Sequence, residues 1–174
     1  MEKPQEVAVT NRIQEELSRL EESAKYSAQG QFEMAKRWRL VHTLLGVATA
    51  VITAIAASLT FAGNHLAVLA GVLGMTGAVG AAVLTALSPQ GRAERAQTSA
   101  NGYLSIQTAA RQVRLIDSQS ESREQLRRSL ARLTKRRDEV NEAAAPISRW
   151  AYEKAKSNID GGGQTYQADS EPGK

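Results

Sequence analysis

The chain has 174 residues, with 22 Lys and Arg against 18 Asp and Glu, so its formal net charge is +4. That excess is too small to argue for nucleic acid, and the absence of cysteine excludes disulfides, thiolate metal sites and a cysteine nucleophile. With only two histidines, His42 and His65, the chain cannot build a histidine-rich metal site.

The N-terminal part is predicted to be one long helix. Residues 1–10 are expected to be a flexible N-terminus, and residues 11–39 a cytoplasmic helix with Asn11 as its N-cap. Steps of four and three define one stripe along this helix: Ile13, Leu17, Leu20, Ala24, Ser27, Gln31, Ala35 and Trp38. Because no proline interrupts the run, the helix is expected to continue into the next segment.

A long uncharged block follows. Residues 40–91 contain no Asp, Glu, Lys or Arg, although 23% of the chain is charged. A soluble core helix needs a polar outer face, which this block lacks. It divides into residues 40–61 and 66–87, each long enough to cross a bilayer core of about 20 helical residues. The four residues between them, 62–65, include Gly and Asn and are predicted to be an external turn.

The charges that flank this hairpin predict its orientation. Basic residues precede the first span and follow the second: Lys36, Arg37, Arg39, Arg92 and Arg95. The turn carries no Lys or Arg, so the positive-inside rule places both termini in the cytoplasm. No cleavable signal peptide is visible. We therefore expect a multi-pass protein of the cell inner membrane, with Pro89 and Gly91 marking a bend after the second span.

Residues 90–159 are predicted to form a cytoplasmic helical bundle. The run 90–117 has the same length as 11–38, so the two helices can pair antiparallel. Ser118 and Glu121 fit a capping box that begins a third helix. The apolar positions of that helix are spaced by four, three and seven: Leu126, Leu130, Leu133 and Val140.

The C-terminal part is predicted to contain one more short helix. Pro146 is expected to begin it, over residues 147–159, because proline suits the first turn. Residues 160–174 contain three consecutive glycines and few apolar residues, which predicts a disordered tail. The fold class is therefore all-α: a membrane protein whose two-helix transmembrane hairpin is extended by long cytoplasmic antiparallel helices.

Basic and aromatic side chains are candidate contacts to lipid headgroups. If the third helix runs back toward the membrane, its basic end approaches anionic lipid. The candidates are Lys36, Arg37, Arg39, Arg132, Lys135, Arg136 and Trp150. The alternative is a solvated basic helix face, and the two interpretations are equally supported. Nucleic acid is the weaker third one, because no aromatic residue interleaves with the basic cluster.

Each span carries a stripe of small or polar residues. In the first span it comprises His42, Gly46, Thr49, Thr53, Ala56 and Thr60, and in the second Ala67, Gly71, Gly74, Ala78, Ala81 and Thr85. Small residues let helices approach closely in lipid, which makes Gly46, Gly71, Gly74, Ala78 and Ala81 helix-packing candidates. Alternatively, His42, Thr49, Thr53 and Thr60 line a water-filled path in an oligomer, although threonine hydroxyls can also bond their own helix.

Signatures of catalysis and of selective conduction are missing. We find no phosphate-binding Gly-rich loop, no serine elbow, no paired carboxylates in an apolar setting and no histidine pair at helical spacing. We therefore expect no enzyme activity, no cofactor and no metal site. The turn lacks acidic residues, so a carboxylate-ring filter is not visible, and any conductance is expected to be poorly selective.

Several short motifs resemble a known family. They are Tyr26-Ser27-Ala28-Gln29-Gly30-Gln31-Phe32, Ala35-Lys36-Arg37-Trp38, a span beginning Leu44-Leu45-Gly46, and a late Ala145-Pro146 step. From about Asn11 to Ile159 the chain is similar to the SLATT domains, two-span effector modules of bacterial conflict systems that associate with nucleotide-synthesising and nucleotide-sensing partners. The resemblance implies a membrane effector that oligomerises and opens a pore when a partner senses infection.

The expected function is therefore that of a pore-forming homo-oligomer in anti-phage, abortive-infection defence. Since no sensor or enzyme domain is attached in the sequence, its trigger is expected from a separate nucleotide-signal enzyme or sensor encoded nearby, or from a ligand of the helical arms. Membrane lipid is the other expected partner, and nucleic acid is not expected. The alternatives are a non-conducting membrane scaffold that recruits a cytoplasmic partner, and a holin-like protein, for which over 100 cytoplasmic residues are more than needed.

Overall fold

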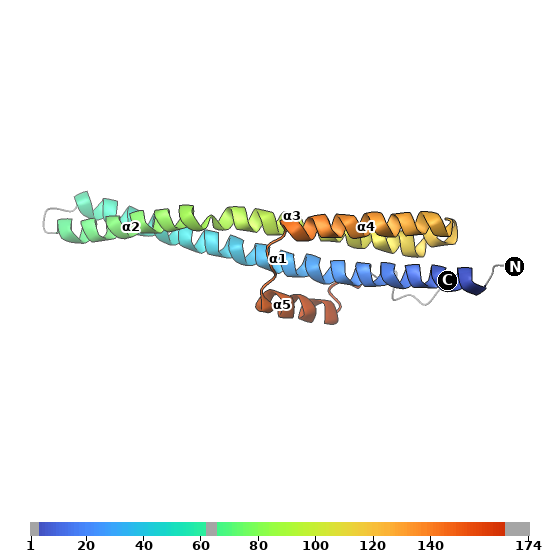
Figure 1. Cartoon of the computed structure of the whole chain (residues 1–174). Helices are drawn as coiled ribbons and strands as arrows, with labels where there is room; N and C mark the ends of the chain where they lie inside the picture. Colours follow the sequence, from blue (N-terminus) through green and yellow to red (C-terminus); the bar gives the residue numbers. More distant parts are fainter. Residues whose placement is uncertain (1–3, 62–65, 166–174) are drawn as a thin grey trace. The chain divides into compact units, whose positions relative to one another are not determined.

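The computed structural model describes residues 4–61 and 66–165, and within these ranges it contains helices and no strands (Figure 1). The all-α class is confirmed. The elements are α1 (Pro4–Phe61), α2 (Ala67–Leu87), α3 (Pro89–Leu115), a 3-10 turn (Asp117–Gln119), α4 (Arg123–Ala143) and α5 (Arg149–Asp160).

The chain divides into two compact units. We call Met1–Met34 with Arg95–Lys174 the bundle unit, and Ala35–Glu94 the hairpin unit. Helix α1 contributes to both, so the prediction that the N-terminal helix continues into the first span is confirmed. Helix α1 begins at Pro4, however, and the prediction of an N-cap at Asn11 is wrong. Proline suits a first helical position, and no breaker separates it from Asn11.

The core of the bundle unit lies between α1, α3 and α4. Its members are aliphatic residues spaced at helical intervals on all three helices: Ile13, Leu17, Leu20, Ala24, Ile106, Ala110, Val113, Leu126 and Leu133. The stripes predicted for the first and third helices therefore bury most of their apolar members, while Trp38, Leu130 and Val140 are partly buried. An ion pair of 2.9 Å between Arg114 and Glu21 joins α3 to α1 at the edge of this core.

The reversal between α3 and α4 is capped one turn later than predicted. Ser118 does not begin the helix, because its hydroxyl donates to the carbonyl of Arg114 at 2.6 Å and so prolongs the end of α3. The capping box is instead formed by Ser122 and Gln125, whose side chains bond each other's backbone amides. The prediction of a Ser118–Glu121 box is wrong because the sequence holds two such patterns in succession.

Helix α5 also begins later than predicted. Its N-cap is Ser148, whose hydroxyl accepts a hydrogen bond from the amide of Ala151, and its first residue is Arg149. Pro146 therefore does not start the helix but lies in the non-helical segment 144–148. Of the predicted tail, Asp160 ends α5 and residues 161–164 form turns. The rest of that tail, residues 166–174, and the predicted turn at 62–65 lie outside the described residues.

Candidate transmembrane hairpin

The two helices of the hairpin unit have the length and composition of membrane spans. The first apolar stretch lies in α1 and the second begins with α2, with windows of mean hydropathy 2.1 and 2.0. Only 6% and 11% of these windows are buried in the structure, whereas the core helix of a soluble protein is mostly buried. Helix α2 has 21 residues, which corresponds to about 32 Å at 1.5 Å per residue and so to the thickness of a bilayer core.

Large aliphatic side chains cover the outside of the hairpin. Exposed members include Leu44, Val51 and Ile55 of α1 and Val72 and Val79 of α2. Patches of this kind on monomeric soluble proteins rarely exceed a few hundred Å². In lipid the same side chains are solvated by acyl chains, so the exposed apolar surface is consistent with a protein that crosses a membrane.

A close seam joins the two spans. A Cβ atom at Gly77 would lie 2.5 Å from Oγ1 of Thr53, and a Cβ at Gly80 would lie 2.7 Å from Oγ1 of Thr49. Each glycine thus accommodates one threonine of the facing helix. Lipid provides no hydrophobic force between helices, so this backbone-to-side-chain approach supplies the van der Waals contact that holds such pairs together.

Several hydroxyl groups in the spans donate to backbone carbonyls of their own helices. Thr53 donates to the carbonyl of Thr49 at 2.8 Å and Thr60 to that of Ala56 at 3.0 Å. In α2, Thr76 and Thr85 likewise donate to carbonyls four residues earlier. These side chains therefore do not require water, and their polarity alone does not indicate a pore.

The helix-packing candidates of both spans lie away from the seam. A Cβ atom at Gly46, Gly71 or Gly74 would meet nothing within 4 Å. The hypothesis that the two predicted stripes pack on each other within one hairpin is therefore wrong for these glycines. Ala78 and Ala81 are also exposed. The physical reason is the helical repeat. At about 100° per residue, glycines three positions apart are rotated by about 60° from one another, so the four glycines of α2 cannot all face α1. The two that meet α1 are Gly77 and Gly80.

The pore-lining candidates divide into two groups. Thr49 and Thr53 lie in the seam against α2, whereas His42 and Thr60 are exposed on α1. A conduction path along this face stays a prediction, since only a second copy could complete it.

The junction between α2 and α3 lies where the sequence predicts a bend. Ser88 has a left-handed backbone (φ 42°), and Pro89, which is fully buried, begins α3 directly after it. At the predicted bend, the helical path is thus interrupted by one residue, Ser88, between α2 and α3. Arg92 reaches across it: its Nε donates to the carbonyl of Leu87 at 2.9 Å, and its guanidinium lies 4.9 Å from the ring centroid of Trp38. A cation at this position compensates the negative end of α2.

The candidate headgroup residues are exposed in both units. Lys36, Arg37 and Arg39 project from α1 next to the first span. On α4, Arg132, Lys135 and Arg136 are exposed as well, and on α5 the ring of Trp150 has the Lys154 ammonium 5.2 Å from its centroid. Contact with lipid stays a prediction for all seven.

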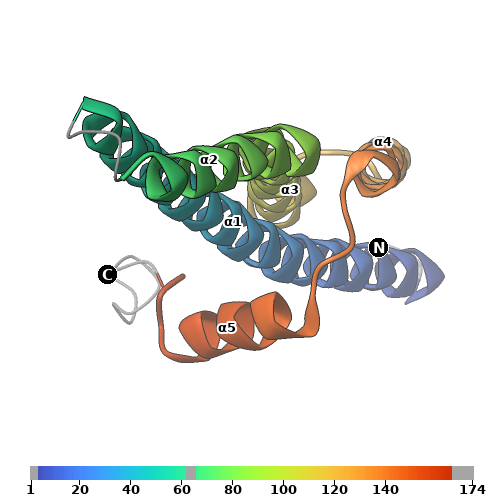
Figure 2. The same ribbon diagram turned by 90° about the vertical axis from the view of Figure 1, so that its left-hand side faces the viewer.

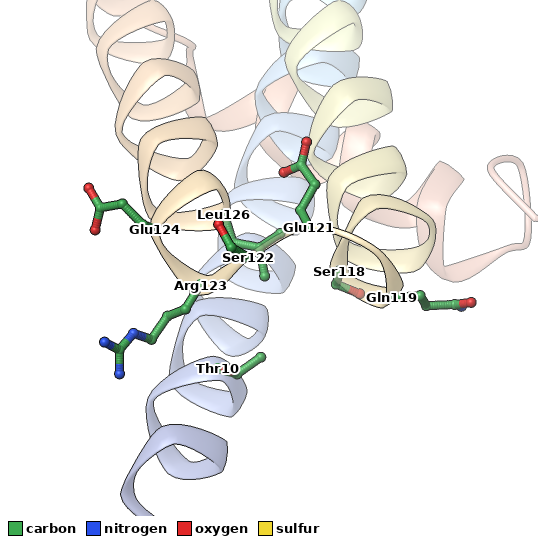
Figure 3. A pocket seen from close by; sticks show the side chains of 8 residues that line it. All are labelled: Thr10, Ser118, Gln119, Glu121, Ser122, Arg123, Glu124 and Leu126. Atoms are coloured by element: carbon green, nitrogen blue, oxygen red, sulfur yellow. The ribbon is translucent and has the colours of Figure 1, made fainter. Parts of the chain in front are cut away.

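The bundle unit has several hollows on its surface. Figure 3 shows one of about 480 Å³ at the α3–α4 reversal, where Thr10, Ser118, Arg123 and Glu124 surround an open depression. Arg123 and Glu124 point outward in this view. Among residues 4–61 and 66–165, no three His, Cys, Asp or Glu side chains are grouped in a way that could hold a metal ion.

Comparison with known proteins places this architecture in a family. The fungal SLATT family model, described as the SMODS and SLOG-associating 2TM effector domain, matches residues 18–143. That range includes both spans, all of α3 and α4, and α1 from residue 18 onward. No curated protein and no solved structure matches the chain. The two-span architecture and the length of the match identify the chain as a member of the family of SMODS and SLOG-associating 2TM effector domains.

Proposed function

We propose that this protein is an oligomeric membrane effector that permeabilises its host membrane in defence against phage or a related invader. Both chain ends then lie on the cytoplasmic side, as the basic flanks of the hairpin indicate. The matched family model is the fungal one, so the proposal applies to a bacterial inner membrane or to a membrane of a fungal cell.

The observation that carries the proposal is a face of small residues that one hairpin leaves unused. The seam within the chain is made by Gly77 and Gly80, whereas a Cβ atom at Gly71 or Gly74 of α2 or at Gly46 of α1 would meet nothing within 4 Å. Small residues in spans permit close approach of a second helix. We assign this face to contacts between copies.

Assembly of several hairpins brings the polar residues of α1 around a common axis. His42 and Thr60 are exposed on α1 and can face this axis, whereas Thr49 and Thr53 lie in the seam against α2. The hydroxyl groups present oxygen atoms without formal charge, so the path favours no ion strongly and conduction is poorly selective. Permeabilisation alone collapses the membrane potential, which requires neither catalysis nor a cofactor.

The trigger is assigned to a separate protein. The family's description names association with SMODS and SLOG partners, which supports a nucleotide-linked enzyme or sensor encoded nearby. Membrane lipid and further copies of the chain are the other partners of the proposal, and nucleic acid is not among them.

Dye leakage from lipid vesicles tests the proposal. Gly74→Leu places a bulky side chain on the unused face, and we expect it to abolish leakage and growth arrest while membrane insertion is retained, because no atom of the same chain opposes that position. Val79→Phe is the matched control: Val79 is exposed on another side of α2, where added bulk meets only lipid. Leakage by Gly74→Leu at the level of the parent protein would contradict the proposal.

A membrane scaffold without a pore is the competing function. Thr53 and Thr60 support it, since their hydroxyls donate to carbonyls of their own helix and do not require water. If the protein is a scaffold, the membrane potential should stay unchanged when the parent protein is overexpressed together with its trigger. It should also stay unchanged with every variant. A holin-like protein would instead lyse cells without any trigger.

A further inference from the structure

Helix α5 is an accessory to the bundle unit. Figures 1 and 2 both show α1 between α5 on one side and the α3–α4 pair on the other. The core cluster of the bundle unit contains residues of α1, α3 and α4 and none of α5. The α5 helix therefore covers the back of α1, and the three-helix core is complete without it.

Small apolar groups make one part of the contact between α5 and α1. Ala151 and Ala155 are fully buried on the inner face of α5. Just before α5, the Ile147 side chain lies against Gly30, where a Cβ atom would be 2.9 Å from its Cδ1. The rings of Tyr26 and Tyr152 meet with centroids 6.4 Å apart.

Polar pairs make the other part of the contact. Lys154 lies 2.9 Å from the carboxylate of Glu33, whose side chain is only 4% exposed. Asn158 donates to Oε1 of Gln29 at 3.3 Å, and Gln31 donates to the carbonyl of Ala145 at 2.7 Å. A buried carboxylate that loses its cation is costly, so this face of α1 needs an occupant of matching charge.

The connection to α5 permits this helix to leave. Residues 144–148 carry no helix, and both Ala144 and Ser148 have extended backbone. The family match ends at residue 143, the last residue of α4, so α5 lies outside the matched range. Ile147 and Ser148 contact α1 at Gly30 and Met34 and so move with α5, which leaves residues 144–146 as the connection. Three extended residues span up to about 10 Å, so exchange requires a neighbouring α1 within that reach.

We infer that α5 is an exchange arm: in the assembled protein, α5 of one copy docks on residues 26–34 of α1 of a neighbouring copy. The occupant of the α1 face is then the same helix, with the same Lys154–Glu33 and Asn158–Gln29 pairs, so exchange requires no new complementarity. Exchange of an identical element is a low-cost route to association of protomers. The inference rests on the oligomeric part of the proposed function and adds a contact outside the membrane.

The absence of cysteine in the sequence allows a direct test. We would co-express full-length chains that carry different tags, one with Gly30→Cys and the other with Ile147→Cys, and oxidise them in native membranes. A disulfide between the two tagged chains forms only if Ile147 of one copy lies on Gly30 of the other. The pair is sterically suited, since the shorter side chain at 147 leaves room for the Cβ at 30.

A matched control comes from the core of the bundle unit. A Cβ atom at Gly102 would lie 3.0 Å from Cγ2 of Val140, a contact between α3 and α4 that does not involve α5. Chains with Gly102→Cys and Val140→Cys are expected to give no mixed disulfide, whereas one chain that carries both substitutions cross-links internally. Co-expression of the Gly30→Cys and Ile147→Cys chains is expected to give a mixed dimer that reductant dissolves. The amount of this dimer should exceed the amount of disulfide dimer formed when either variant is expressed alone.

Three results would overturn the inference. The first is that no mixed disulfide forms although amine cross-linking shows oligomers. The second is that the protein does not oligomerise at all. The third is that the 30/147 and 102/140 pairs give equal amounts of mixed disulfide. Vesicle leakage, measured on the same preparations, separates this inference from the pore. A mixed disulfide without leakage would contradict the proposed pore and support the exchange of α5. Leakage without a mixed disulfide would contradict the exchange of α5 only.

Charge reversal gives a second, independent readout. Glu33→Lys and Lys154→Glu each place like charges together within one chain and are expected to release α5, seen as faster amide exchange over Arg149–Asp160. When the two variants are mixed, the carboxylate introduced at position 154 of one copy can dock on the ammonium introduced at position 33 of the other. Amide exchange over α5 of the Lys154→Glu chain should slow in the mixture, and the inference fails if mixing changes nothing.

Discussion

The close approach of Gly77 to Thr53 makes a sharp prediction for the hairpin. In Gly77→Ala the new Cβ would lie 2.5 Å from Oγ1 of Thr53, about 0.9 Å nearer than ordinary van der Waals contact begins. The hydroxyl cannot turn away freely, because it donates to the carbonyl of Thr49 at 2.8 Å. Either that hydrogen bond breaks or the two spans separate.

The magnitude follows from comparison with Gly74→Ala. Both substitutions gain the same helix propensity, up to about 1 kcal/mol. Only Gly77→Ala overpacks the seam, at a cost of about 1–3 kcal/mol, whereas a Cβ at Gly74 meets nothing within 4 Å. The free energy of unfolding of Gly77→Ala should therefore lie about 1–3 kcal/mol below that of Gly74→Ala.

Reversible unfolding in mixed micelles, with increasing SDS and far-ultraviolet circular dichroism as the signal, measures this difference. Equal stability of the two alanine variants would refute the seam. A further variant identifies the cause: Thr53→Ala removes the opposing oxygen, so the penalty of Gly77→Ala should largely vanish in the Thr53→Ala background. A penalty that persists there would mean that the clash is not with Thr53.

Other predictions concern the bundle unit. Leu126→Ala empties a fully buried position and should lower the free energy of unfolding by about 2–5 kcal/mol in a denaturant titration; an effect below about 1 kcal/mol would contradict the burial of this residue. Ser122→Ala removes the cap of α4 and should cost about 1 kcal/mol, whereas Ser118→Ala should cost less, and the reverse order would favour the earlier cap. Burial raises the pKa of the Tyr103 phenol above its ordinary value of 10.0, against the opposing effect of Arg137, so the folded state holds this proton more tightly than the unfolded chain. The stability that this group contributes should be fully present below pH 10.0 and fall as the pH rises above it, and Tyr103→Phe should fall less steeply in the same titration.

The sequence predicts the spans well because their signal is compositional. The stretch without charge begins at residue 40, and the predicted segments 40–61 and 66–87 agree with the end of α1 at Phe61 and with α2 at Ala67–Leu87. Desolvation of charge is a strong, local effect, so a count of ionised residues is enough to find it. The apolar stripe that includes Leu126 and Leu133 is predicted for a similar reason, since its spacing alone marks the buried face of the helix.

Where the sequence contains two similar patterns, it does not show which of them the structure uses. Two capping patterns follow each other at Ser118 and Ser122, and only the length of α3 selects the second. The glycines of α2 recur every third residue, so their sequence does not reveal which pair faces α1. The contact of Lys154 with Glu33 joins segments far apart in the chain, and neither residue belongs to a recognisable motif.

The central claim is that residues 40–61 and 66–87 cross lipid as a hairpin. Single-cysteine labelling measures it directly, because the parent chain has no cysteine. In intact cells or sealed spheroplasts, a maleimide that cannot cross membranes should label Asn64→Cys from outside, and should label Gln119→Cys, which is exposed on the bundle unit, only after the membrane is opened. Equal labelling of both positions from one side, or a parent protein that remains soluble without detergent, would contradict the account.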